Sequence, residues 1–336
     1  MAAPVHARKE LGRCYALTQP TWNALLQAGI GTEREDRMGI TTTDHWANKG
    51  DVRLAMRRKQ SGAAGSGRGT VLLVHGSTWA GLPSFDLQVP GRPQSSVLTT
   101  LAEHGFDAWT LDNEGYGLSD KSRAITCDVA NGADDIEAAA AYIERHNGGR
   151  PIMLYGISSG ALKAALFAQR HPSKVVRLVL DAFVWTGRNS PTLIERAKKL
   201  DYWSSRLRRP IDIAYVHSVF NRDHPGVAEE AVIVALAEAT LAQGHEVPTG
   251  SYIDMCAHLP VVDPTKITVP TAILRGEHDG VAAYEDIRAF FDLLPNADKM
   301  LAIMPGIAHA SFQEKNYMTV YHYLLAFLTT PAAVYK

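Results

Sequence analysis

The segment Gly156-Ile157-Ser158-Ser159-Gly160 places a serine between two glycines, after an apolar run and before residues with helical spacing. A sharp strand-to-helix turn strains its central residue and brings the residues two before and two after it into contact, which only glycine tolerates well. The following helix would direct its free N–H groups at the same place. We therefore expect Ser158 to be a nucleophile. The alternative is a glycine-rich turn with a capping serine.

A serine hydroxyl is a poor nucleophile until a base accepts its proton. Among 13 histidines, His309 is the candidate base, because it follows the last strand-like run and precedes the last helical stretch; His278 is the alternative. The acid that orients His309 is expected at Asp279, after the penultimate strand-like run, and Asp181 is the alternative. The chain order is then nucleophile, acid and base.

The tetrahedral intermediate of such a reaction carries an oxyanion that needs two backbone donors. We expect one to be the N–H of Ser159, directly after the nucleophile. The other is expected in the segment His75-Gly76-Ser77-Thr78-Trp79, which follows the apolar run 71–74. The glycine allows the backbone to approach the substrate carbonyl, so the N–H of Ser77 is the predicted second donor, with Thr78 as the alternative.

These residues need a sheet that brings several loops to one edge. Apolar runs typical of strands buried on both faces lie at 71–74, 106–111, 151–155, 175–180, 272–274 and 300–304, and helical stretches lie between them at about 95–104, 133–146, 159–170, 283–294 and 315–328. An Asn-Lys-Gly-Asp turn joins two further strand-like runs, 40–47 and 52–58, into a hairpin. This alternation predicts an α/β fold with a mostly parallel central sheet and helices on both faces.

One long stretch interrupts the alternation. From 183 to 262 no apolar run is typical of a buried strand, and about 80 residues is too long for an ordinary crossover. We expect a helical lid inserted over the carboxyl edge of the sheet. The predicted organisation is a peripheral segment (1–39), the first part of the core (40–182), the lid (183–262) and the second part of the core (263–336).

The lid is rich in aromatic and basic side chains. Large aromatic residues are candidates for contact with an apolar substrate: Trp79 on the loop after the first strand of the core, and Trp185, Trp203 and Tyr252 in the lid. The basic residues Arg196, Lys198, Lys199, Arg206, Arg208 and Arg209 are interpreted as a solvated face. The alternative is that one arginine binds a substrate carboxylate, as in a monoester of a dicarboxylic acid.

The composition excludes several other classes of protein. The formal net charge is −1, which gives no reason to expect nucleic acid or an anionic membrane as partner. Three widely spaced cysteines argue against a disulfide framework and have no metal-ligand spacing. No secretory signal and no membrane span is recognised, so we expect a cytoplasmic protein without metal or cofactor. The oligomeric state stays open, with a homodimer through the lid as one alternative.

Taken together, five motifs resemble those of the α/β-hydrolase superfamily, in the right order from about residue 40 to 330: His75-Gly76, Asp112-x-x-Gly115-x-Gly117-x-Ser119, Gly156-x-Ser158-x-Gly160, Gly276-x-x-Asp279 and Gly306-x-x-His309. The resemblance implies a serine hydrolase that cleaves a small or medium carboxylic ester through an acyl-enzyme. Hydrolysis of a C–C bond, lactone or amide, acyl transfer, and a non-catalytic receptor are the alternatives. Epoxide hydrolases and dehalogenases are disfavoured because they carry aspartate at the position of Ser158.

Overall fold

The computed structural model describes residues 39–62 and 67–331, so the predicted peripheral segment 1–39 lies outside it apart from its last residue. Its centre is an eight-stranded sheet in the order β1-β2-β4-β3-β5-β6-β9-β10. The predicted hairpin is confirmed as β1 (Ile40–Lys49) and β2 (Val52–Ser61), and β2 is antiparallel to β4. The remaining neighbours are parallel, as the alternation of strands and helices predicted.

The predicted apolar runs form the parallel strands. They are β3 (Thr70–Val74), β4 (Asp107–Leu111), β5 (Ile152–Ile157), β6 (Val175–Asp181), β9 (Thr271–Gly276) and β10 (Lys299–Met304). Every residue of β3 is buried, because successive side chains enter two different cores. Leu72 and Val74 pack into one core, whereas Val71 and Leu73 pack into the other.

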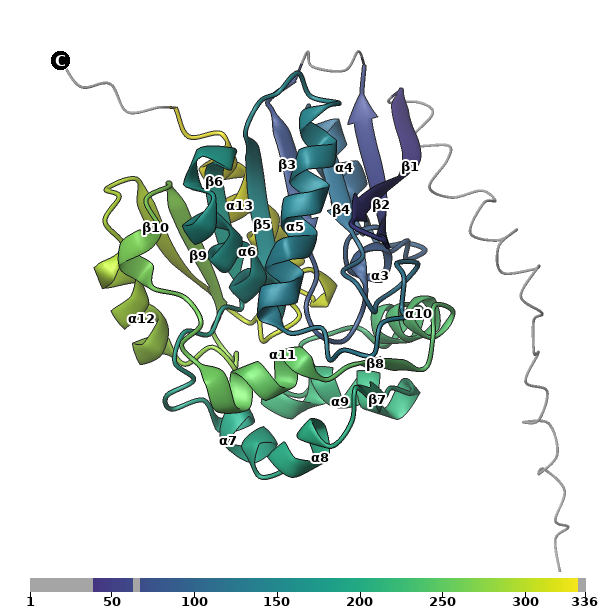
Figure 1. Ribbon diagram of the computed structural model, residues 1–336, viewed down its shortest axis with the longest axis vertical. Helices are drawn as coiled ribbons and strands as arrows, with labels where there is room; N and C mark the ends of the chain where they lie inside the picture. The colour runs from purple at the N-terminus through teal and green to yellow at the C-terminus, as the bar shows by residue number, and fades with distance from the viewer. Residues whose placement is uncertain (1–38, 63–66, 332–336) are drawn as a thin grey trace, which may run out of the picture.

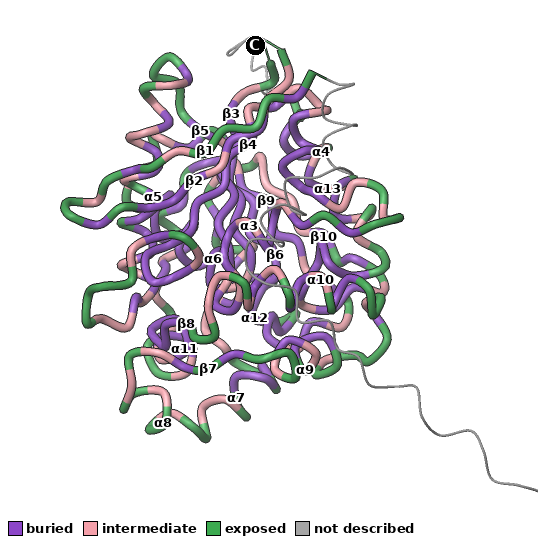
Figure 2. Tube along the Cα trace, turned by 90° about the vertical axis from the view of Figure 1, so that its right-hand side faces the viewer, coloured by how far each residue is buried: buried purple, intermediate pink, exposed green. Residues whose placement is uncertain are grey.

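Helices cover both faces of the sheet. The first core joins the sheet to α5 (Val129–Glu144), α6 (Ser159–Arg170) and α12 (Tyr284–Leu293), and the second joins it to α4 (Val97–Glu103) and α13 (Tyr317–Leu328). Figure 1 shows α5 and α6 in front of the strands and α4 and α13 behind them. In Figure 2 the buried strands lie inside these helices and the exposed residues gather on the outer loops and the lower segment.

The helix α5 begins earlier than the sequence predicted. Its first residue is Val129, because the side chain of Asp128 caps the helix by accepting from the N–H of Asn131. The Asn131-Gly132 pair, which precedes the predicted helical stretch 133–146, lies inside the helix. A Cβ on Gly132 would lie 2.5 Å from Cδ of Lys163 on α6, so the glycine allows the two helices to pack closely.

The segment between β6 and β9, residues 182–270, is called the insertion here. Its helices are α7 (Pro191–Ala197), α8 (Leu200–Ser204), α9 (Ile213–Asp223), α10 (Glu230–Leu241) and α11 (Gly250–Ile253), followed by a π-helical segment (Asp254–His258) and a short 3-10 helix (Pro264–Lys266). Figure 1 shows the insertion across the lower edge of the sheet. Two short strands that the sequence did not indicate, β7 (Arg208–Pro210) and β8 (Glu246–Pro248), pair within it, because three residues are too few to show a period.

The turn from β5 to α6 has almost no free space around its glycines. Ser158 adopts φ 57° and ψ −124°, a left-handed conformation that is strained for a serine. A Cβ on Gly156 would lie 2.3 Å from the carbonyl oxygen of Gly160, and a Cβ on Gly160 would lie 2.3 Å from that of Val74. The structure therefore contains the crowding that the sequence predicted, in which only glycine fits at positions 156 and 160.

A buried carboxyl group connects three segments at the carboxyl edge of the sheet. Asp181, the last residue of β6, accepts hydrogen bonds from the hydroxyl of Tyr155 on β5 at 2.6 Å and from that of Ser311 at 3.0 Å. Burial, opposed by these two hydrogen bonds, raises the pKa of Asp181 to about 7. The protonated form is therefore favoured in the folded protein only below about pH 7.

Replacing Gly160→Ala is expected to destabilise the protein by roughly 3 kcal/mol or more, or to prevent folding, because the new methyl group would overlap a strand carbonyl. Ser159→Ala is the matched control: its buried hydroxyl has no hydrogen-bond partner among the described residues, so its loss should change stability by less than about 0.5 kcal/mol. Urea denaturation measures both, and equal stability of the two variants would contradict the steric explanation.

Asp181→Asn is expected to change how stability depends on pH. Because the pKa of Asp181 is higher in the folded than in the unfolded chain, its stabilising effect is present at low pH and is lost as pH rises towards 7. From pH 5 to pH 8, the free energy of unfolding of the wild type should fall by roughly 2–3 kcal/mol relative to the variant. Urea denaturation at both pH values measures this difference; parallel pH dependence would show that Asp181 is ionised throughout.

Candidate active site

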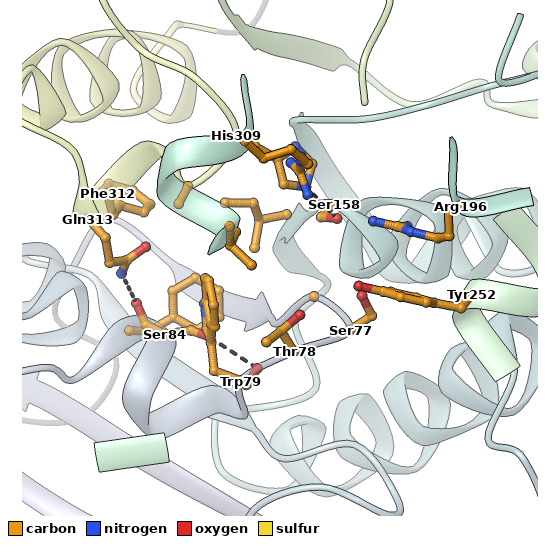
Figure 3. A pocket seen from close by; sticks show the side chains of 16 residues that line it. Ser77, Thr78, Trp79, Ser84, Ser158, Arg196, Tyr252, His309, Phe312 and Gln313 are labelled. Atoms are coloured by element: carbon orange, nitrogen blue, oxygen red, sulfur yellow. Dashed lines mark hydrogen bonds between the residues drawn. The ribbon is translucent and has the colours of Figure 1, made fainter. Parts of the chain in front are cut away.

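Three loops at the carboxyl edge of the sheet bring a serine, a histidine and an aspartate into one line. The hydroxyl of Ser158, after β5, lies 2.9 Å from Nε2 of His309, after β10. Nδ1 of the same histidine lies 2.9 Å from Oδ1 of Asp279, after β9. That oxygen also accepts the backbone N–H groups of Val281 and Ala282, so the carboxylate is held in place independently of the histidine. Figure 3 shows His309 directed at Ser158.

The alternative base and acid considered from the sequence lie elsewhere. The ring of His278 stacks on that of His224, with 4.0 Å between centroids, and its Nε2 lies 3.7 Å from Glu277. Asp181 directs both carboxylate oxygens at hydroxyl groups and makes no hydrogen bond to His309. Among the candidates, Asp279 is therefore the carboxylate that contacts the histidine.

The loop that carries His309 is held by a carboxyl group that the sequence did not reveal. Glu314 is 1% exposed and accepts the backbone N–H groups of Ala308 and Ala310, on either side of the histidine. Burial, opposed by these two hydrogen bonds, raises the pKa of Glu314 to about 7. A glutamate just before a helix is a common pattern, so nothing in the sequence distinguished it.

The two predicted backbone donors lie beside Ser158. Ser159 is the first residue of α6, where the N–H groups have no partner within the helix. Ser77 and Thr78 both line the cleft, and a Cβ on Gly76 would lie 3.4 Å from Cβ of Ser158, so this loop runs directly past the nucleophile. The sequence analysis expected Gly76 to let this loop come close to the reacting carbonyl, and the loop does lie against Ser158.

The site opens into a cleft between the sheet and the insertion. Its walls are lined by residues from the core and the insertion: Gly76, Ser77, Thr78, Trp79, Ser84, Phe85, Ile157, Ser158, Arg196, Val219, Arg222, Tyr252, His309, Ala310, Phe312 and Gln313. Of the four aromatic candidates, Trp79 and Tyr252 line the cleft. Trp185 instead donates from its indole to the carbonyl of Val262, and Trp203 donates to that of Arg196, so both pack the insertion.

The basic residues of the insertion do not form one solvated face. Arg209 is 1% exposed and donates from Nη2 to the carbonyl of Ser77 at 2.9 Å and to the hydroxyl of Thr78 at 3.2 Å. Its guanidinium lies over the rings of Tyr252 and Tyr215, which replace water around the charge. The interpretation of these basic residues as a solvated face is therefore wrong for Arg209. A run of basic residues in the sequence does not show which aromatic rings will cover one of them in the fold.

The part of the chain that the structure describes contains no group of three histidine, cysteine, aspartate or glutamate side chains placed to bind a metal ion. Across residues 39–62 and 67–331, no helix combines the length and the hydropathy needed to cross a bilayer.

Comparisons with known proteins identify the family of the chain. The model of the family described as serine aminopeptidase, S33 matches residues 66–316. A monoacylglycerol lipase of Mycolicibacterium smegmatis is 22% identical over 253 residues, which cover 74% of this chain and 83% of that protein.

Two solved structures share the fold. A bacterial membrane phospholipase A has a TM-score of 0.65 at 22% identity, with 92% of this chain and 91% of that chain covered. A soluble variant of the monoglyceride lipase of Saccharomyces cerevisiae has a TM-score of 0.63 at 19% identity, with 85% and 94% covered. The family match spans about three quarters of the sequence; it includes the strands from β3 to β10 and the loops at the carboxyl edge, whereas β1 and β2 precede it. The chain therefore belongs to the serine aminopeptidase S33 family of α/β-hydrolases.

Proposed function

We propose that this protein is a serine hydrolase that cleaves a carboxylic ester through an acyl-enzyme formed on Ser158. The observation that carries the proposal is the hydrogen-bonded line from Ser158 through His309 to Asp279, with 2.9 Å at each step. The family and the lipase relative support hydrolysis, and the name of that relative favours an ester over an amide, lactone or C–C bond.

In the first half of the reaction, His309 accepts the proton of Ser158 while the serine oxygen attacks the ester carbonyl. Asp279 holds the imidazole in the tautomer that presents Nε2 to the serine and stabilises the imidazolium. The backbone N–H groups of Ser77 and Ser159 donate to the oxyanion of the tetrahedral intermediate. Collapse of this intermediate releases the alcohol, which takes its proton from His309.

In the second half, His309 activates a water molecule that attacks the acyl-enzyme, and the acid leaves when Ser158 recovers its proton. The sum of both halves is ester plus water giving acid plus alcohol.

We further propose that residues 183–262 act as a cap on the core, since Arg196, Val219, Arg222 and Tyr252 of this segment line the cleft above Ser158.

Exposure to a fluorophosphonate probe is expected to add one phosphonyl group to the wild-type protein and none to Ser158→Ala, as measured by intact-protein mass spectrometry. Turnover of 4-nitrophenyl butyrate by the variant should fall by about 10³-fold or more, because attack by the serine is lost. Ser159→Ala is the control for a neighbouring hydroxyl and should still be labelled. An adduct that persists in Ser158→Ala would contradict the assignment.

Asp279→Asn is expected to lower kcat by roughly 10³–10⁴-fold with little change in KM, because the amide no longer favours the tautomer that accepts from Ser158. Glu277→Gln, two residues earlier on the same loop, is the control: its side chain accepts the N–H of Gly306 and lies 3.7 Å from His278, and among the described residues it makes no hydrogen bond to His309. Steady-state kinetics give kcat and KM for both variants. A similar kcat for the two would show that Asp279 does not orient His309 in catalysis.

A further inference from the structure

The cleft has two chemically different sides. Figure 3 shows Trp79, Ser84 and Phe312 on one side of Ser158, and Arg196 and Tyr252 on the other. The first side is largely apolar, since the ring of Trp79 stacks on that of Phe220 with 6.0 Å between centroids. The second side is cationic. A substrate that fills both sides must therefore combine an apolar part with a part that suits a guanidinium group.

Arg196 is a cation directed into the cleft without an anionic partner. Figure 3 shows its side chain, from α7, extended toward Ser158 above Tyr252, whose ring centroid lies 3.8 Å from the guanidinium carbon. Among the described residues, no carboxylate forms an ion pair with Arg196, and none of the residues that line the cleft is acidic. The ring supports one face of the guanidinium and leaves its N–H edge free to donate.

The two other arginines near the cleft are less available to a substrate than Arg196, one because it is paired and the other because it is buried. Arg222 also lines the cleft, but it donates twice to the carboxylate of Asp223, at 2.6 and 2.7 Å, and is therefore neutralised. Arg209 lies beneath Tyr252, where its guanidinium carbon is 4.1 Å from the ring centroid, and two of its nitrogens have no hydrogen-bond partner among the described residues.

The positive charge around Tyr252 is therefore only partly compensated. Although burial opposes the effect, the charges of Arg196 and Arg209, together with a hydrogen bond from Tyr215, lower the pKa of Tyr252 to about 7. An anion is stabilised at this position for the same reason that the phenolate is. A neutral acyl or alcohol chain would gain nothing from these charges.

We propose that Arg196 binds a carboxylate of the substrate, so that the enzyme acts on esters in which one part carries a carboxylate and the other is apolar. This inference rests on the proposed ester hydrolysis at Ser158. A carboxylate accepts two parallel hydrogen bonds from the edge of a guanidinium, and this fork sets the position of the ester relative to the serine. The carboxylate also pairs with Arg196, which forms no ion pair with a carboxylate of the described residues, and adds to the partial compensation that Tyr252 gives.

The test uses pairs of esters that differ only in one charge. One pair is 4-nitrophenyl hydrogen adipate and 4-nitrophenyl methyl adipate, with the carboxylate in the acyl part. The other is the butyrate ester of 4-hydroxybutanoate and that of its methyl amide, with the carboxylate in the alcohol part. In at least one of the two pairs, wild-type kcat/KM for the charged ester should exceed that for the neutral ester by about tenfold or more. Rates with Ser158→Ala are subtracted as background.

The charged-to-neutral ratio of kcat/KM is the readout for variants, because general damage to the protein affects both esters of a pair alike. Arg196→Gln should lower this ratio by about 10- to 100-fold, mostly through KM for the charged ester. Arg196→Lys should retain part of it, since the charge remains but the fork is lost. Lys198→Gln removes the same charge two residues away, where the lysine pairs with Glu195, and should leave the ratio unchanged.

The outcomes separate this inference from the proposed function. If the wild type cleaves both esters of each pair equally well, or if Arg196→Gln leaves the ratio intact, the carboxylate site is refuted while ester hydrolysis stands. If the wild type cleaves none of the four esters and takes up no fluorophosphonate, the proposed function itself fails. A ratio that falls equally in Lys198→Gln would assign the preference to the general field of the insertion and overturn the role of Arg196.

Discussion

The backbone of α6 runs so close to the backbones of β3 and β5 that neither Gly156 nor Gly160 has room for a Cβ, and the rest of the site is arranged around this contact. The close approach forces Ser158 into a left-handed conformation, which costs on the order of 1–3 kcal/mol in isolation. The parallel pairing of β5 with β3 and β6 and the burial of α6 maintain that conformation. The result is a half-buried serine hydroxyl that lines the cleft at the end of a strand, beside the N-terminus of a helix.

The opposite side of the site is positioned by buried carboxyl groups rather than by backbone contact. Glu314 holds the peptide groups on both sides of His309, and Asp181 joins Ser311, two residues later, to the central strands. Hydrogen bonds of this kind restrict the loop without using the side chain of the histidine itself. The histidine therefore stays free to exchange a proton while its backbone remains in place, which is what preorganised catalysis requires.

The insertion contributes to the core as well as covering it. Arg209 crosses from β7 to the carbonyl of Ser77, so a side chain of the insertion helps to fix the loop beside Ser158. Arg196, thirteen residues earlier, enters the cleft from the same segment. The proposed carboxylate site at Arg196 and the loop near Ser158 are thus connected through Arg209 and the ring of Tyr252, which lies between the two arginines.

The sequence by itself determined the sheet, its covering helices and the family, because apolar runs, helical spacing and closely spaced glycines are local signals. The order of Ser158, Asp279 and His309 along the chain also followed from their places after strand-like runs. Only the tertiary structure decided that Glu314 holds the histidine loop, that Trp185 and Trp203 pack the insertion while Tyr252 lines the cleft, and that Arg209 is buried but Arg196 faces the cleft. The reason is physical: a charge or a ring has its role set by the groups around it, and those groups come from parts of the chain that are far apart in sequence.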